Sequence, residues 1–147
     1  ETVFIRENRD YKGGSVVREI KFRGYAPDLQ EWFYGLIVEQ PNDYNLGCEM
    51  VTDGLPVIVE DKTVGQYTGL KDKNGTDIYE GDILEVMSFE GNKNICSVTF
   101  DDGCFSHVGY LGDLRTYPLR DFLFNGSKLE VIGNIYENPE LLKEESK

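Results

Sequence analysis

The sequence predicts a mainly antiparallel β protein, built as one or two small barrel-like sheets with a short C-terminal helix. Its 147 residues include 16 glycines and 12% aromatic residues, and turn signals recur at intervals of about ten residues, as in all-β folds. Apolar and polar side chains alternate along several segments, which is the pattern of strands with one buried face. No segment before residue 137 keeps the helical spacing of apolar residues.

The first half of the chain predicts a hairpin with one buried face. Residues 18–25 and 31–40 both alternate, and the segment between them contains Pro27 and marks a turn. We expect the first strand to place Ile20 and Phe22 opposite a charged face that includes Arg23. The second strand is expected to bury one row of side chains: Trp32, Tyr34, Leu36 and Val38. Weaker strands are expected near Cys48–Thr52 and Pro56–Glu60.

A tight hairpin is predicted around residues 71–77, and charge selects its register. A two-residue loop at Asn74 and Gly75 would set Asp72 opposite Asp77, and like charges in opposed positions are destabilising. A three-residue loop at 73–75 sets Lys71 opposite Asp77 instead, which contributes roughly 0.2–1 kcal/mol. We therefore predict the three-residue loop, with Gly75 at positive φ.

The segment Glu80-Gly81-Asp82 predicts a further turn, in which Gly81 bends the backbone. We expect the two acids, Glu80 and Asp82, to cap backbone N–H groups and to face water. The next run, Ile83–Phe89, is apolar on both faces, which indicates an inner strand of a sheet.

The last predicted hairpin joins residues 95–100 to residues 104–110. Its loop, Asp101-Asp102-Gly103, is expected to have three residues and to end in Gly103. This register places Cys104 on the buried face of the sheet and His107 on the wetter face.

The end of the chain combines two more expected strands with the helix. The strands are Tyr117–Phe124 and Lys128–Tyr136, and Asn125-Gly126 separates them. Asn138 is a favoured helix N-cap, Pro139 fits the first turn, and Glu140 favours the positive end of the helix dipole. We expect residues 143–147 to fray.

Charge and cysteine content exclude several classes of protein. Acidic residues outnumber basic ones by 27 to 15, and the net charge of −12 excludes nucleic-acid binding by overall attraction. Residues 25–61 contain eight acids and no Lys or Arg. The three cysteines form no C-x-x-C pair, so we expect free thiols in a reducing cytoplasm. No segment has the roughly 20 apolar residues of a transmembrane helix, so we expect no membrane contact.

Three stretches resemble the YopX family of proteins encoded by prophages and temperate phages. They are Arg18–Tyr25 (REIKFRGY), residues 64–84 (VGQYTGLKDKNGTDIYEGDIL) and residues 131–142 (VIGNIYENPELL). The resemblance implies one YopX-like β-rich domain over residues 18–142, with a possible subdivision near residue 62. Residues 1–17 precede it as an extension of uncertain origin. The resemblance also implies an accessory protein that assembles with itself, and it supplies no catalytic residues.

The sequence contains no motif with the residue types and spacing of a catalytic or metal site. An EF-hand loop with Gly75 at its sixth position would need carboxylates at Leu70 and Gly81, so the pattern fails. Cys104 and His107 alternate across a strand and are not expected to form a dyad. Phosphate-binding glycine motifs are absent from the sequence. We expect no catalytic residue, no metal site and no cofactor.

The sequence thus favours a cytoplasmic, non-enzymatic protein-binding module that self-associates and binds a host or phage protein. Aromatic residues commonly anchor interfaces, and the candidate binding residues are Trp32, Tyr34, Tyr67 and Tyr79. The turn residues Asn74, Gly75, Gly81, Asp82 and Gly103 are expected to be structural. Two alternatives stay open: an acidic inhibitor that mimics nucleic acid to occupy a DNA-binding protein, and an enzyme that uses carboxylates such as Glu80 and Asp82.

Overall fold

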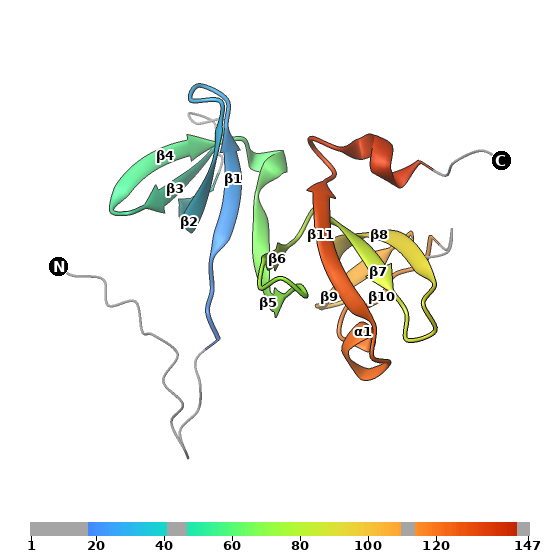
Figure 1. Ribbon diagram of the computed structural model, residues 1–147. Helices are drawn as coiled ribbons and strands as arrows, with labels where there is room; N and C mark the ends of the chain where they lie inside the picture. Colours follow the sequence, from blue (N-terminus) through green and yellow to red (C-terminus); the bar gives the residue numbers. More distant parts are fainter. Residues whose placement is uncertain (1–17, 41–46, 110–113, 144–147) are drawn as a thin grey trace, which may run out of the picture.

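The computed structural model describes residues 18–40, 47–109 and 114–143. Within them the strands form two antiparallel sheets, and the fold is mainly β as the sequence predicts (Figure 1). The strands are β1 (Phe22–Ala26), β2 (Glu31–Glu39), β3 (Cys48–Thr52), β4 (Leu55–Val59), β5 (Gly65–Lys71), β6 (Asp77–Tyr79), β7 (Asp82–Met87), β8 (Lys93–Asp101), β9 (Cys104–Val108), β10 (Tyr117–Pro118) and β11 (Lys128–Asn134). The helical segments are η1 (Asp61–Thr63), α1 (Asp121–Phe124) and η3 (Pro139–Leu142).

The first sheet has six strands in the order β4-β3-β2-β1-β5-β6, and it curls around a small core. The curl brings the end of β4 to β1, where the Glu60 N–H donates to the Tyr25 carbonyl at 2.8 Å. Gly24 permits this approach, because a Cβ there would lie 2.6 Å from Cγ2 of Val59. The sheet nevertheless does not close into a barrel.

The buried face of β2 is the opposite of the one predicted. Phe33 and Ile37 point inward and pack with a core formed by Ala26, Cys48, Met50 and Val59. Tyr34 and Leu36 lie on the other face and are about half exposed. Both faces of this strand carry apolar residues, so alternation alone could not choose between them. The choice depends on β3 and β4, which pack Met50 and Val59 against the inner face.

The second sheet has five strands in the order β10-β9-β8-β7-β11. β7 is an inner strand as predicted, because it lies between β8 and β11 and its Ile83, Leu84 and Val86 are fully buried. Ile78 of β6 belongs to the first sheet by hydrogen bonding but packs in the core of the second. The chain passes from one sheet to the other between Tyr79 and Asp82.

The predicted three-residue loop between β8 and β9 is wrong by one residue. Asp101 pairs with Cys104 and Phe100 with Phe105, so the loop consists of Asp102 and Gly103 alone. Both loop residues have positive φ, +48° and +78°, a combination that favours two-residue hairpins. The observed register also stacks Phe100 edge-to-face against Phe105, with ring centroids 5.3 Å apart. Gly103 is a turn residue as predicted.

The segment after β9 departs from the prediction in two places. Residues 117–124 form the two-residue strand β10 and the short helix α1 rather than one strand. The C-terminal helix is the 3₁₀ segment η3, which begins at Pro139. The Asn138 side chain does not cap it and instead accepts a hydrogen bond from the Asn134 N–H at 3.2 Å.

Several predictions lie outside the described residues or are untested by them. The predicted extension, residues 1–17, and most of the predicted tail, residues 144–147, are outside the described ranges. The subdivision near residue 62 stays a prediction.

Candidate functional site

The two sheets are joined by an ion pair between Arg23 of β1 and Asp82 of β7. Arg23 Nη1 lies 2.6 Å from Asp82 Oδ1, and only 1% of the Asp82 residue is exposed. Asp82 Oδ2 accepts the Tyr79 N–H at 2.8 Å, while Arg23 Nη2 donates to the Glu80 carbonyl at 3.2 Å. Asp82 therefore caps a backbone N–H group as predicted, but the predictions that Asp82 faces water and that Arg23 lies on a charged outer face are wrong.

Burial and charge act in opposite directions on this carboxyl group. Burial raises the pKa of Asp82, whereas the Arg23 guanidinium and the hydrogen bond from Tyr79 lower it. The net direction is upward. Removing Arg23 would leave the carboxylate buried without its charge partner, so the pair acts as one unit.

The four predicted binding residues gather around this ion pair. The Arg23 guanidinium carbon lies 5.2 Å from the Trp32 ring centroid and 5.1 Å from that of Tyr79. Tyr79 also contacts Tyr34 and Tyr67, at centroid distances of 5.6 Å and 5.7 Å. Such separations fit tilted and edge-to-face aromatic contacts. The sequence analysis named these four residues as binding candidates but did not place Arg23 among them, and their binding role stays a prediction.

Burial divides the four aromatic residues into two pairs. Tyr67 and Tyr79 are buried, and burial raises the pKa of Tyr79 to about 12. They are packing residues and offer little surface to a ligand. Trp32 is half-buried and Tyr34 is 51% exposed, so these two can still contact another molecule.

Trp32 ties the first sheet to the C-terminal segment. Its indole Nε1–H donates to Glu137 Oε1 at 2.8 Å, and its ring lies 5.9 Å from that of Tyr136. Asn134 Nδ2 donates to the second oxygen of the same carboxylate at 3.0 Å. The Glu137 carboxylate thus bridges β2 and the end of β11.

Sequence reasoning missed the role of Asp72 in the hairpin loop between β5 and β6. The predicted loop and the pairing of Lys71 with Asp77 are confirmed, and Gly75 has φ +81°. Asp72, however, is buried: Oδ1 accepts the N–H groups of Asn74 and Thr76, and Oδ2 accepts the Val131 N–H at 3.0 Å. This carboxylate therefore fixes the loop and also joins it to β11.

A signal for one of the two buried acids was present in the sequence. Asp82 begins a strand that is apolar on both faces, and the first residue of such a strand lies close to the core. No comparable local signal marks Asp72 or Arg23, whose partners lie 59 residues away along the chain.

The first sheet leaves a half-exposed apolar surface on its outer side. We define the β2–β4 outer face as the residues that the strand register places side by side there: Tyr34, Leu36, Val51, Pro56 and Ile58. Tyr34, Leu36 and Ile58 are 51%, 48% and 46% exposed. At its Tyr34 end this face meets the aromatic cluster around Arg23.

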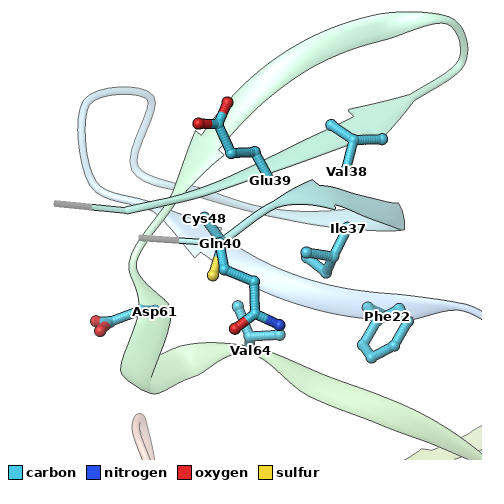
Figure 2. A pocket seen from close by; sticks show the side chains of 8 residues that line it. All are labelled: Phe22, Ile37, Val38, Glu39, Gln40, Cys48, Asp61 and Val64. Carbon is cyan, nitrogen blue, oxygen red and sulfur yellow. The ribbon is translucent and has the colours of Figure 1, made fainter. Parts of the chain in front are cut away.

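The inner side of the same sheet contains a pocket of about 640 Å³. Figure 2 shows its lining, which includes the Cys48 thiol, the Gln40 amide and the apolar side chains of Phe22 and Val64. Burial raises the pKa of Cys48, and the Asp61 carboxylate adds to the shift. The thiol is therefore kept in its protonated form, which is a poor nucleophile.

His107 and Cys104 lie apart in the second sheet. His107 is buried, which corrects its predicted place on the wetter face, and its ring stacks on Phe122 at 4.1 Å. Burial lowers the pKa of His107. Cys104 is on the opposite face of β9, with its sulfur 3.3 Å from Ser106 Oγ. The two side chains therefore do not form a catalytic dyad.

Comparison with known proteins identifies the family. The model of the YopX protein family matches residues 21–143. The chain belongs to the YopX family. The crystal structure of protein EF1440 from Enterococcus faecalis resembles this YopX protein with a TM-score of 0.53 and 27% identity, over 86% of this chain and 100% of that chain. A comparison with curated proteins gives no match.

The stretches that resemble the YopX family supply several of the contacts that join the two sheets. Arg23 lies in the first stretch, Asp72 and Asp82 in the second, and Glu137 in the third. In the ranges that the structure describes, no three His, Cys, Asp or Glu side chains are grouped so that they could hold a metal ion. Nor does any helix there have the length and apolar character needed to cross a membrane.

Proposed function

We propose that this YopX-family protein is a phage-encoded accessory protein that acts by binding another protein rather than by catalysis. The observation that carries the proposal is the β2–β4 outer face. Contiguous apolar surface on a folded chain commonly marks a protein interaction site. Tyrosine and tryptophan often anchor such sites, and Tyr34 and Trp32 lie at one end of this face.

The acidic residues considered for catalysis already have structural contacts. Asp82 binds Arg23 and the Tyr79 N–H, and Glu80 Oε2 accepts the Gln66 N–H at 2.7 Å. Acid–base catalysis by a pair of carboxylates needs both groups to face the substrate in one cleft. These contacts favour the binding proposal over a carboxylate-dependent enzyme.

The proposal includes self-association in the cytoplasm of a bacterial host. β4 is an edge strand of the first sheet, and its five residues, Leu55–Val59, carry no charge. Edge strands without charged side chains can pair with a strand of another chain. A light-scattering mass above the 16.8 kDa of one chain would support self-association, and a mass of one chain at all working concentrations would contradict it.

Affinity capture with matched variants tests the binding proposal. The bait proteins are the wild type, Leu36→Ser, Ile58→Ser and the control Phe124→Ser, which removes an 83% exposed apolar side chain elsewhere. We expect a host or phage protein to be captured by the wild type and Phe124→Ser and lost from the other two. Equal capture by all four baits would contradict the docking face.

A further inference from the structure

We propose that the β2–β4 outer face binds a protein surface that is rich in Lys and Arg around an apolar centre. This inference rests on the proposed function and specifies the chemistry of the partner. Its basis is that the apolar face and the most acidic segment of the chain coincide. Residues 25–61 contain no Lys or Arg, and every residue of the face lies within them.

Acidic side chains frame the apolar residues of the face. Glu49 lies beside Leu36 and Val51 on the same side of the sheet, because it pairs with Ile58. Glu39 lies opposite Glu49 in the register of β2 and β3. The exposed Asp53 occupies the turn between β3 and β4. A surface with an apolar centre and a charged rim matches a partner with the same layout and the opposite charge.

Two of the framing acids, Glu49 and Asp53, are not neutralised within the described part of the chain. Glu60 forms an ion pair with Lys62 at 2.9 Å. Glu49 and Asp53 form none there. Both of these acids lie at the edge of the β2–β4 outer face, Glu49 in β3 and Asp53 in the turn that follows it. Cations from a partner could therefore pair with Glu49 and Asp53 without breaking an ion pair of the described residues.

A second copy of the chain is a poor occupant of this face. A symmetric contact would place one acidic frame against another. Several of the cations that a copy could offer from its described residues already form ion pairs: Lys21 and Lys71 with Asp77, Arg23 with Asp82, Lys73 with Glu130 and Lys93 with Glu85. Nucleic acids and anionic membranes are repelled by the same frame. A basic protein is the occupant that charge complementarity selects.

The test uses proteins of the bacterial host, separated on DNA–cellulose into a retained fraction and a flow-through. Nucleic-acid-binding proteins carry basic surfaces, so the retained fraction is enriched in them. Each fraction is applied to immobilised wild-type protein, to the double variant Glu49→Gln/Asp53→Asn, to Leu36→Ser and to the control Glu90→Gln/Glu140→Gln. The control removes the same number of charges from exposed sites away from the face.

We expect capture from the retained fraction to exceed capture from the flow-through at least about tenfold, and to fall by a similar factor between roughly 50 and 500 mM salt. The double variant and Leu36→Ser should both lose this capture, and the control should keep it. Capture that is equal from both fractions, or that survives in the double variant, overturns the inference. If Leu36→Ser alone loses capture, the proposed binding function stands without the basic partner. If no variant changes capture, both fail.

Discussion

Replacing Asp72 with asparagine tests whether one buried carboxylate holds the β5–β6 loop against the second sheet. Asp72 Oδ1 accepts N–H groups from Asn74 and Thr76 at 2.8 Å and 2.9 Å, and Oδ2 accepts the Val131 N–H at 3.0 Å. Asparagine keeps one oxygen of nearly the same shape, so the loop bonds can persist in neutral form. The second oxygen becomes an amide N–H₂, which cannot accept the Val131 N–H.

The expected loss of stability follows from these three bonds. A hydrogen bond to a charged group contributes about 1.5–3 kcal/mol, and a neutral bond contributes about 0.5–1.5 kcal/mol. The variant loses one charged bond and weakens two. Because Asn74 and Thr76 are exposed, water can hydrogen-bond to their N–H groups and offset part of the weakening of these two bonds. We expect the free energy of unfolding to fall by roughly 2–4 kcal/mol in total.

Urea unfolding at two pH values measures the effect and its dependence on charge. Burial pushes the pKa of Asp72 upward, but the hydrogen bonds from Val131, Thr76 and Asn74 outweigh it and hold the pKa below its ordinary value of 3.8. The stability that Asp72 contributes is therefore complete above pH 3.8 and is lost as the pH falls through the folded-state pKa. The difference between wild type and Asp72→Asn should be large at pH 7 and smaller near pH 3.

A matched control separates this effect from the loss of any surface charge. Asp102→Asn changes an exposed residue at positive φ, a conformation that asparagine also tolerates, and should alter stability by less than about 0.5 kcal/mol. The reasoning is refuted if Asp72→Asn unfolds at the wild-type urea concentration at pH 7. It is also refuted if the difference grows as the pH falls.

Three further predictions concern the junction of the sheets and the thiols. Asp82→Asn should lower the free energy of unfolding by about 3–5 kcal/mol. In a double-mutant cycle with Arg23→Met, the double variant should lose less stability than the sum of the two single losses. Additive losses in urea unfolding would contradict the ion pair. Gly65→Ala should lower the free energy of unfolding by about 2–3 kcal/mol, because the added Cβ would lie 2.6 Å from the Glu80 carbonyl oxygen. A melting temperature within about one degree of the wild type would contradict this prediction. In a thiol titration Cys104 should react in the folded protein, whereas Cys48 and Cys96, both buried and the latter with a pKa raised to about 12, should react only after unfolding; three equal rates would contradict the burial.

Local sequence was enough to predict features that depend on local contacts. The pairing of Lys71 with Asp77 followed from two charges and a glycine within seven residues, and the structure confirms it. A three-residue loop that ends in glycine was also predicted between β8 and β9, and the observed register there differs from the prediction by one residue. There Asp102 adopts positive φ itself, so glycine alone no longer marks the left-handed position.

The parts of the site that could not be predicted depend on contacts between distant segments. The ion pair of Arg23 with Asp82 and the bond from Val131 to Asp72 form only when the two sheets meet. Local sequence could not predict which face of β2 is buried either, because that depends on the packing of β3 and β4 against it. The four aromatic residues named as binding candidates do lie together at this junction, but the burial of Tyr67 and Tyr79 was not predictable, and the binding role of the four stays a prediction.

Most of the residues that join the sheets lie outside the part of the sequence that forms the face proposed to bind a partner. Arg23, Asp72, Asp82 and Glu137 fall in the three stretches that resemble the YopX family, at residues 18–25, 64–84 and 131–142, whereas Trp32, which binds Glu137, lies in β2. The β2–β4 outer face lies between the first and second stretches. A chain could therefore keep the same frame of two sheets while its outer face changes in charge and shape. The partner of this protein is therefore to be determined from the chemistry of residues 31–60.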